Sequence, residues 1–457
     1  MMKATFLLAC GIGILISSCT ETTKMTDSAP VKLITLNPGH FHAALVQKSI
    51  YPQVDSNVYV YAPDGPDVQM HLDKINAYNQ DSVKPTHWNE IVYKGDDYLE
   101  KMLKEKKGNV VVLAGNNQLK TDYILQSVKA GYNVFADKPM AINEKGFEEL
   151  KQAFEAAKQN KVLLYDIMTE RYEITTILQR EMSMQPELFG ELQKGTAEDP
   201  AVTKESVHHL YKYVSGAVLT RPAWFLDVTQ EGEGIVDVTT HLVDLVQWEC
   251  FPDQVLDYTK DIQMNTAKHW PTVMTKAEFT ELTKDTSYPD YLKKYTDAKN
   301  NLNVLCNGEM NYTIKGVHAK VSVTWNYKAP EGTGDTHYSI MRGTKASLII
   351  RQGAEQQYKP VLYIEPIKQI PEYEKQVEAI VAKIAGQYPG ISLQKNAKGW
   401  EVIIPEKYKE GHESHFARVT EKYIDYLLHH NIPDWEVPNM LAKYYTTTQA
   451  YQLANKK

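Results

Sequence analysis

The chain has 457 residues, a formal net charge of −7 and ordinary hydrophobic and charged fractions of 43% and 23%. Such a composition excludes a largely disordered chain. The acidic balance, without a run of Lys or Arg, argues against a nucleic-acid partner. At roughly 150 residues per domain the length corresponds to two or three domains. We therefore expect a globular, multidomain protein that does not bind nucleic acid.

The first residues are typical of a bacterial lipoprotein leader. One lysine precedes a short apolar run, and small residues follow before Cys19. Because the run is too short to span a bilayer, it indicates a cleaved signal peptide. "ISSC" resembles a lipobox, so we expect residues 1–18 to be removed and residues 19–30 to form a polar tether whose Cys19 carries lipid. An ordinary signal peptide with an incidental cysteine is the alternative.

The lipid would anchor the protein to a membrane on the periplasmic side of the cell envelope. With Cys10 removed and Cys19 lipidated, only Cys250 and Cys306 remain. A single disulfide between them is compatible with an oxidising compartment, although the sequence does not establish that they are close. The cysteine spacing is not that of a zinc site.

Residues 31–170 alternate short apolar strands with amphipathic helices. Strands are predicted at VKLITL, SNVYVYA, NVVVLAG, YNVFADKP and KVLLYDI. Helices are predicted from about Ala43, in YLEKMLKEKKG, in DYILQSVKAG, and after Asn143 as N-cap. Strands without polar alternation indicate a parallel sheet covered on both faces, hence a doubly wound α/β domain. Ligands of such sheets bind beyond the carboxyl ends of the strands.

The pattern changes after residue 170. GVHAKVSVTWN alternates apolar and polar residues, which is typical of an antiparallel strand with one packed face. HYSIMRG, ASLIIRQ, PVLYIEP and SVHHLYKYV predict further strands, residues 255–300 resemble an insertion, and residues 414–456 are predicted to be helical. We therefore expect residues 171–457 to form an α+β domain with an open, mainly antiparallel sheet and C-terminal helices. The site is expected between the two domains, and the open sheet is a candidate surface for homo-oligomers.

The strand sequence NVFADKPM ends in a lysine followed by a proline. Proline restricts the residue before it to extended backbone. Lys138 is therefore expected to point into the ligand crevice with little freedom. Partial burial there would lower its pKa and suit it to proton transfer. Taken alone, this short motif is also compatible with a surface lysine in a tight turn.

In EGEGIVDVTTHLVDLVQW, Asp237 precedes His241 by four residues, so on a helix the two side chains share a face. Histidine is the usual general acid/base near neutral pH, and an adjacent acid can orient or tune it. A helix-capping aspartate and a structural histidine are the alternative.

Together these segments resemble the Gfo/Idh/MocA oxidoreductase family. DKP resembles its Glu-Lys-Pro motif, GEGIVDVTTH its glycine segment with Asp-x-x-x-His, and VVVLAGNN its cofactor-contacting strand and turn. The resemblance covers most of residues 31–350 and implies a Rossmann domain followed by an open antiparallel α/β domain. By position it implies that Lys138, Asp237 and His241 are catalytic. His241 would take the hydroxyl proton of the substrate, and Lys138 would hold that oxygen and the cofactor end.

The resemblance also implies a dinucleotide cofactor. At the three Gly-x-Gly-x-x-Gly positions the chain has Asn37, Gly39 and His42, so only the middle glycine is kept. An acid after the second strand favours NAD over NADP, because a carboxylate repels the 2′-phosphate. Free NAD is scarce outside the cytoplasm, so we expect it to be tightly held. The expected cofactor-binding residues are Asn37, Gly39, His40, His42, Asp64 (or Asp67), Gly115, Asn116, Asn117 and Lys138.

The substrate that the resemblance implies carries a secondary hydroxyl on a sugar, glycoside or cyclitol. Glycoside 3-oxidation and redox-neutral cleavage with retained NAD both remain open. Candidate substrate contacts are Arg171, Tyr172, His208, His209 and Trp224.

Two other functions fit parts of the sequence. The degraded glycine motif fits a carbohydrate-binding lipoprotein without catalysis. His40 and His42 form an HxH pattern that, with His208, His209, Asp237 and Asp244, would supply the ligands of a metal-dependent hydrolase. Such hydrolases generally use a barrel, whereas the second half here is predicted to be antiparallel, so we expect no metal.

Overall fold

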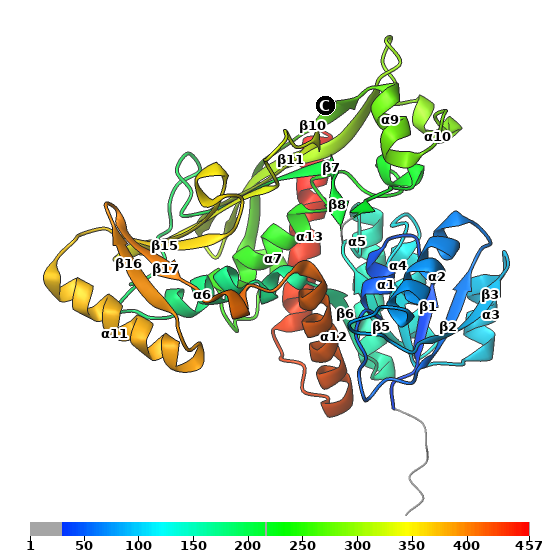
Figure 1. The fold of residues 1–457 in the computed structure, drawn as a ribbon, viewed down its shortest axis with the longest axis horizontal. Helices are drawn as coiled ribbons and strands as arrows, with labels where there is room; N and C mark the ends of the chain where they lie inside the picture. The colour runs from blue at the N-terminus through cyan, green and yellow to red at the C-terminus, as the bar shows by residue number, and fades with distance from the viewer. Residues whose placement is uncertain (1–29, 215–216, 457) are drawn as a thin grey trace, which may run out of the picture.

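The computed structural model describes residues 30–214 and 217–456 (Figure 1). The predicted signal peptide and the lipidation candidate Cys19 lie outside the described residues. Within the described ranges, no helix combines the length and the apolar composition that a membrane span requires. Two sheets organise the fold, and we call them the first sheet and the second sheet.

The first sheet has six parallel strands in the order β3-β2-β1-β4-β5-β6. Strands β1 and β4 are entirely buried, as expected for a sheet with helices on both faces. The strand order reverses direction between β1 and β4, which places the ligand crevice beyond their carboxyl ends. The predicted doubly wound domain is thus confirmed. Its elements are β1 (Leu33–Leu36), α1 (His42–Leu45), β2 (Asn57–Ala62), α2 (Pro66–Asn79), β3 (Asn89–Lys94), α3 (Tyr98–Glu105), β4 (Val110–Leu113), α4 (Lys120–Lys129), β5 (Asn133–Asp137), α5 (Glu144–Asn160) and β6 (Leu164–Ile167).

Two elements of this domain were missed in the sequence, and one predicted helix is only a single turn. Strand β3 lies at the edge of the sheet with mostly exposed side chains, so it lacks an apolar run. Helix α2 buries only Val68, His71 and Ile75, which is too narrow a face to predict from periodicity. The helix predicted from about Ala43 ends at Leu45. By contrast, Asn143 caps α5 as predicted, because its side chain accepts a hydrogen bond from the Gly146 amide.

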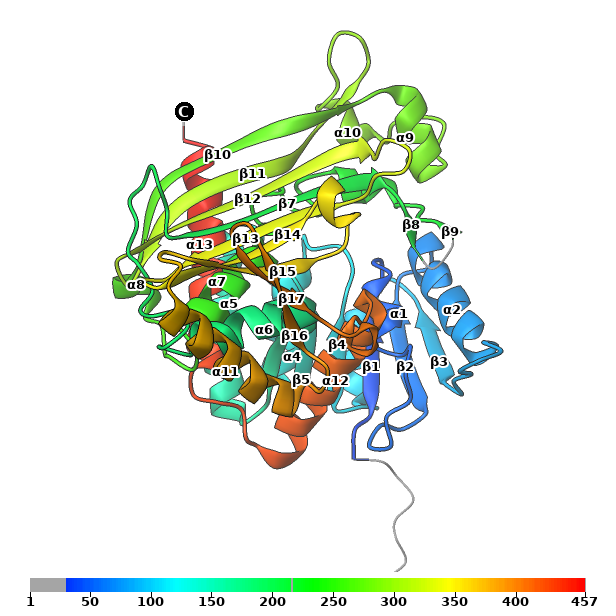
Figure 2. The ribbon, with the colours of Figure 1, turned by 60° about the vertical axis from the view of Figure 1, so that its left-hand side comes forward.

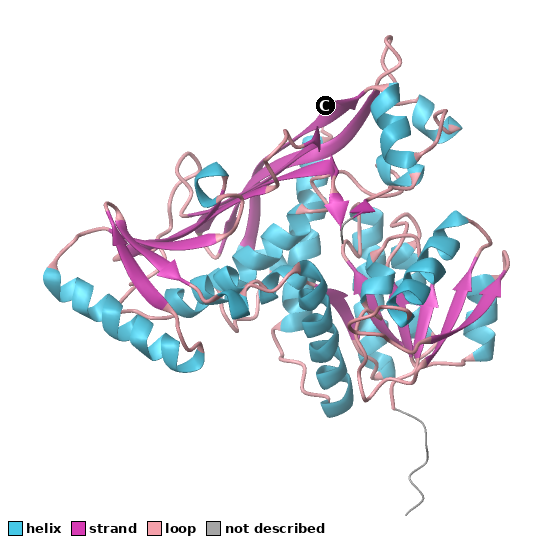
Figure 3. Ribbon diagram, viewed as in Figure 1, coloured by secondary structure: helices cyan, strands magenta, loops and turns pink. Residues whose placement is uncertain are grey.

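The second sheet has nine strands in the order β10-β11-β12-β7-β13-β14-β15-β17-β16 and is antiparallel except between β12 and β7. This confirms the predicted open, mainly antiparallel sheet. Residues 255–300 supply its edge strand β10 and are therefore not a separate insertion. Figures 2 and 3 show the long, twisted sheet with α6, α7 and α13 against one face. Its strands are β7 (Val202–Tyr211), β10 (Ile262–Met274), β11 (Leu302–Ile314), β12 (Val317–Lys328), β13 (Thr336–Arg342), β14 (Ala346–Gln352), β15 (Val361–Pro366), β16 (Ser392–Asn396) and β17 (Gly399–Ile403).

Helices and short elements complete the second part of the chain. The α-helices are α6 (Ile174–Ser183), α7 (Thr239–Cys250), α8 (Tyr258–Asp261), α9 (Lys276–Thr283), α10 (Asp290–Lys293), α11 (Pro371–Gln387), α12 (His412–His429) and α13 (Glu436–Ala454). The short elements are β8 (Tyr213–Val214), β9 (Ala217–Val218) and the 3-10 helices η1 (Thr169–Tyr172), η2 (Ala223–Leu226), η3 (Ala354–Gln356) and η4 (Glu406–Tyr408). Cys250 and Cys306 are both free thiols.

Helices α12 and α13 lie between the two sheets (Figure 1). Tyr423 of α12 stacks on Phe135 of β5, with ring centroids 4.4 Å apart, and belongs to the core of the first sheet. Helix α13 packs on α7 and β10 of the other domain. The C-terminal helices therefore fix the position of one sheet relative to the other.

A buried ion-pair network holds these elements together. Arg171 of η1 pairs with Asp244 of α7 (Nε–Oδ2, 2.6 Å) and with Glu436 of α13 (Nη1–Oε1, 3.0 Å). Lys443 of α13 pairs with the same Asp244 and with Asp166 of β6, at 2.8 and 2.7 Å. Arg171 was predicted to bind substrate, but its guanidinium is committed to this network, so its position is that of a structural residue.

Arg171→Met is expected to lower the free energy of unfolding by about 3–5 kcal/mol, because it leaves the buried Glu436 carboxylate without its partner and leaves Asp244 with Lys443 alone. Urea denaturation measures the loss. The matched control is Arg351→Met, whose partly exposed pair with Glu365 (2.9 Å) is worth at most about 1 kcal/mol. Equal losses in the two variants would contradict the structural role of Arg171.

Candidate active site

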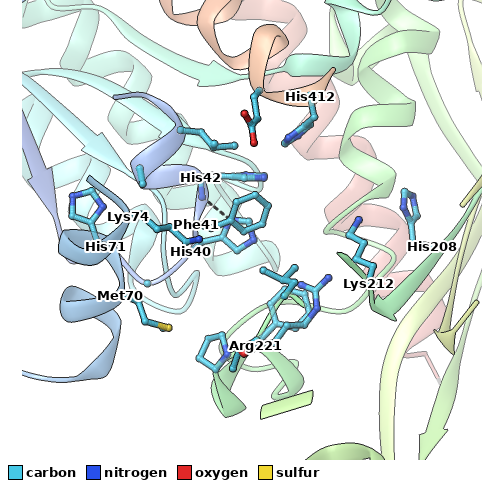
Figure 4. Close-up of a pocket in the computed structure, with 18 of the residues that line it drawn as sticks. His40, Phe41, His42, Met70, His71, Lys74, His208, Lys212, Arg221 and His412 are labelled. Carbon is cyan, nitrogen blue, oxygen red and sulfur yellow. Dashed lines mark hydrogen bonds between the residues drawn. The ribbon is translucent and has the colours of Figure 1, made fainter. Parts of the chain in front are cut away.

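A cavity of about 1020 Å³ lies between the two domains, beyond the carboxyl ends of the first sheet (Figure 4). The first domain contributes the turn after β1, α2 and Lys138. The second contributes the end of β7, the segment around Arg221, the start of α7 and the first residues of α12. This is the place where the doubly wound sheet predicts a ligand.

Lys138, Asp237 and His241 all line this cavity. Lys138 follows β5, and its Nζ forms an ion pair with Asp237 Oδ1 across the domain boundary. Asp237 lies just before α7, and His241 lies in the first turn of that helix. The Nδ1 atom of His241 is buried and has no hydrogen-bond partner within the described part of the chain. The structure thus brings together the three residues that the sequence motifs indicated.

Burial controls the protonation state of His241, whereas neighbouring carboxylates control that of Lys138. Burial, with help from the Lys138 ammonium, holds the pKa of His241 well below its ordinary value, so the imidazole is neutral at pH 7. Burial alone would lower the pKa of Lys138, but the carboxylates of Asp237 and Asp137 outweigh it and raise that pKa. The expected lowering was therefore wrong. Lys138 is a permanent hydrogen-bond donor, and His241 is the group able to accept a proton.

The turn after β1 has the shape of a dinucleotide turn. Asn37 adopts a left-handed backbone (φ 46°), which asparagine tolerates. A Cβ at Gly115 would lie 2.6 Å from the Asn37 carbonyl oxygen and 2.9 Å from the Gly39 nitrogen. Only glycine at position 115 therefore allows the end of β4 to pack this closely on the turn.

The backbone amides of this turn are poorly placed to bind a pyrophosphate. The Gly39 and His40 amides both donate to the Ala114 carbonyl at 3.2 Å, so neither points freely at a ligand. Trp224 donates its Nε1 hydrogen to Asp67 Oδ2 at 2.8 Å, and its ring lies 3.2 Å from where a Cβ of Gly39 would be. The phosphates of a dinucleotide would therefore need donors from elsewhere.

Asp64, Asn116 and Asn117 were also predicted to bind the cofactor, but they contact other parts of the protein. Asp64 is exposed and forms an ion pair with Lys94 at 3.0 Å, while its alternative, Asp67, lines the cavity. Asn116 donates to the Gln230 side chain at 2.7 Å, and Asn117 donates to the Glu231 carbonyl at 2.7 Å. These two asparagines tie the first domain to the segment before α7.

Only some of the predicted substrate-binding residues line the cavity. His208 lines the cavity, and its Nε2 lies 2.9 Å from Ser206 Oγ. His209 is buried, with its Nδ1 2.8 Å from Asp335 Oδ1. Trp224 lies over Gly39, and Tyr172 packs against the core of the first sheet, so neither lines the cavity.

Several cavity residues were not predicted: Glu170, Lys212, Arg221, Glu231 and His412. Arg221 carried a usable signal, because it precedes Pro222 as Lys138 precedes Pro139. His412 carried none, since it reaches the cavity from the start of α12, far along the chain.

His40, His42 and Asp137 are the described residues close enough to share a metal ion, with their ligand atoms within 4.8 Å of one another. His42 Nδ1 is already 2.9 Å from Asp137 Oδ2, and the Lys120 ammonium donates to the Asp137 carbonyl oxygen at 3.1 Å. These residues therefore belong to a hydrogen-bonded cluster beside the positively charged Lys120. The rest of the suggested hydrolase set is not assembled here, since Asp244 pairs with Arg171 and His209 with Asp335.

Comparisons with known families agree with this architecture. The family described as "Oxidoreductase family, NAD-binding Rossmann fold" matches residues 57–166, and the one described as "Putative oxidoreductase C terminal domain" matches residues 178–455. The chain therefore belongs to the Gfo/Idh/MocA oxidoreductase family and is an NAD(P)-dependent oxidoreductase. No curated protein matches the sequence at a significant level.

Solved structures show the same fold. A "putative oxidoreductase" from Parabacteroides merdae is 58% identical, with a TM-score of 0.91, and the match covers 93% of this chain and 98% of that one. Levoglucosan dehydrogenase in complex with NADH and levoglucosan is 11% identical, with a TM-score of 0.57 and coverage of 93% and 97%. A 3-ketoreductase from Actinomadura kijaniata in complex with NADP is 11% identical, with a TM-score of 0.53 and coverage of 92% and 97%.

Gly115→Ala is expected to destabilise the protein by about 1–3 kcal/mol and to weaken NAD binding, because the new Cβ pushes the Asn37–Gly39 turn away from β4. Thermal denaturation and titration with NAD measure the two effects. Gly386→Ala serves as the control, since a Cβ there meets no atom within 4 Å. Unchanged NAD affinity in the Gly115 variant would show that this turn does not contact the cofactor.

Proposed function

We propose that the protein oxidises a secondary hydroxyl group of a sugar, glycoside or cyclitol, using NAD. The observation that carries the proposal is the convergence of Lys138, Asp237 and His241 from two domains on one cavity. An ammonium donor beside a neutral imidazole is the pair of groups that alcohol oxidation requires, one to hold the oxygen and one to take its proton.

Each residue has a separate task in this chemistry. Lys138 donates a hydrogen bond to the hydroxyl oxygen and stabilises the negative charge that develops as the O–H bond breaks. Asp237 fixes the ammonium through their ion pair and keeps it protonated. His241 accepts the hydroxyl proton, because burial keeps its imidazole neutral. When bound, NAD supplies the acceptor for the hydride that leaves the carbinol carbon, so the alcohol becomes a ketone.

A carbohydrate substrate is supported by the cavity and by two relatives of low identity. Phe41, Phe225 and Trp325 line the cavity and give part of its wall the aromatic character that suits a sugar. One of these relatives is a levoglucosan dehydrogenase with levoglucosan bound, and the other is a 3-ketoreductase. The preference for NAD rests on the acid after β2, with Asp67 better placed than the exposed Asp64.

The decisive experiment measures small molecules released from the denatured protein by mass spectrometry, followed by turnover of a glycoside panel read as nicotinamide fluorescence. NAD is expected in the wild-type protein. Lys138→Met and His241→Gln are each expected to lower turnover at least about 100-fold, because each removes a group that acts on the hydroxyl proton. Lys315→Met and His318→Gln, at the β11–β12 turn outside the cavity, are the matched controls. Full turnover in both cavity variants would overturn the assignment.

We also propose that the protein is a lipoprotein on the periplasmic side of the envelope. The "ISSC" sequence and the polar residues 19–30 that follow it support the proposal. The described chain enters the fold at the amino end of β1, whereas the cavity lies beyond the carboxyl ends of the strands.

Cys19→Ser is expected to move the protein from the membrane fraction to the soluble fraction and to abolish incorporation of labelled palmitate, since the acceptor sulfur is removed. Cys10→Ser, within the predicted leader, should change neither readout. Palmitate labelling that persists in the Cys19 variant would contradict lipidation at this position.

A further inference from the structure

Arg221 is a buried cation without an acidic partner. Its residue exposure is 4%, yet it lines the cavity. Its Nε donates to the Leu210 carbonyl oxygen at 3.0 Å. Among residues 30–214 and 217–456, no carboxylate oxygen lies within ion-pair distance of its guanidinium. Its two terminal amino groups have no hydrogen-bond acceptor among these described residues.

The side chain is nevertheless held in one orientation. Its guanidinium stacks on Phe225, 4.2 Å from the ring centroid, and lies 5.3 Å from that of Trp325. Its backbone amide donates to the Leu282 carbonyl at 3.1 Å, and Pro222 follows it. Burial lowers the pKa of Arg221 to about 10, so it remains a cation at neutral pH. The group is charged and preorganised.

Three other buried cations among the described residues have the contacting carboxylate that Arg221 lacks. Arg171 pairs with two carboxylates, Lys443 pairs with two, and Lys204 lies 2.8 Å from Glu249. A buried charge without a counter-charge is costly, because the lost hydration is not replaced. A negatively charged ligand group in the cavity would remove that cost.

Arg221 occupies a central position in the cavity wall. Figure 4 shows His40 and His42 on one side of the cavity, Lys212 and His208 on the other, and Arg221 between them. Lys212 lies 3.6 Å from Asp335, so its charge is already partly balanced. Unlike Lys212, Arg221 has no carboxylate in ion-pair contact among the described residues.

We propose that Arg221 is the anion-binding residue of the cavity and that its guanidinium receives a phosphate or carboxylate group of the bound ligand. The identity of that ligand rests on the proposed function: the group is either a phosphate of the dinucleotide or a carboxylate carried by the sugar. A planar guanidinium matches both groups, because it offers two parallel N–H donors.

The surroundings of Arg221 support a role beside the dinucleotide turn. Phe225, which stacks under Arg221, also stacks on His40 with ring centroids 6.5 Å apart. Since the Gly39 and His40 amides already donate to Ala114, the turn cannot bind phosphate through them without rearranging. Arg221 would supply the missing charge from the second domain.

The test compares Arg221→Met with the wild-type protein in direct binding, read by quenching of tryptophan fluorescence. The probes are inorganic pyrophosphate, NAD, methyl β-glucuronide and, as the neutral probe, methyl β-glucoside. At least one anionic probe is expected to lose about tenfold or more in affinity, while the glucoside is unaffected. Losses for pyrophosphate and NAD identify the cofactor phosphate as the source, and a loss for the glucuronide alone identifies the substrate carboxylate.

Arg180→Met is the matched control. Arg180 also donates its Nε to a backbone carbonyl (Trp248, 3.1 Å) and stacks on an aromatic ring (4.8 Å), but it has an acidic partner in Asp253. The Arg180→Met variant should bind every probe with wild-type affinity. Thermal denaturation tests whether both variants are folded. The proposal is overturned if Arg221→Met keeps all three anion affinities, or if the wild type binds none of the anions. Arg221-dependent anion binding without sugar oxidation would overturn the proposed function alone.

Discussion

The ion pair between Lys138 and Asp237 crosses from the first sheet to the turn before α7, and the arrangement of the cavity depends on it. A buried ammonium tolerates loss of water only with a carboxylate beside it. Here the carboxylate comes from the other domain, so docking of the two domains supplies the counter-charge of Lys138. The charge of this cavity lysine is thereby coupled to the domain arrangement that α12 and α13 maintain.

Burial also sets the charges of the remaining cavity groups. Burial, with the nearby Asp237, raises the pKa of Glu231 well above its ordinary value, and burial raises that of Glu170 to about 7. The imidazoles shift the opposite way, and His241 remains neutral. The raised pKa values disfavour the charged forms of these two carboxyl groups, and Asp237 is paired with Lys138. This balance suits an anionic ligand group beside Arg221.

The sequence was informative where a function is encoded locally. Lys138 is marked by the proline after it, and Asp237 and His241 are marked by their spacing, so these residues could be found without knowing the fold. The ion pairs of Arg171 could not be foreseen, because the carboxylates that pair with it come from α7 and α13, far along the chain. The same limit applied to the pKa of Lys138. Its burial could be anticipated at the end of a strand, but the effect of Asp237 and Asp137 on the charge depends on distances that only the fold supplies.

The segment from Arg221 to Glu231 joins these observations. Trp224 covers Gly39 and bonds to Asp67, while Asn116 and Asn117 hold Gln230 and Glu231 against the first domain. The Trp224 ring lies 3.2 Å from the place of a Cβ on Gly39, so it occupies the space beside the only glycine kept in the dinucleotide turn. Arg221 begins the same segment and lines the cavity. One short stretch of the second domain therefore carries both the ring that covers the turn and the guanidinium proposed to bind an anion.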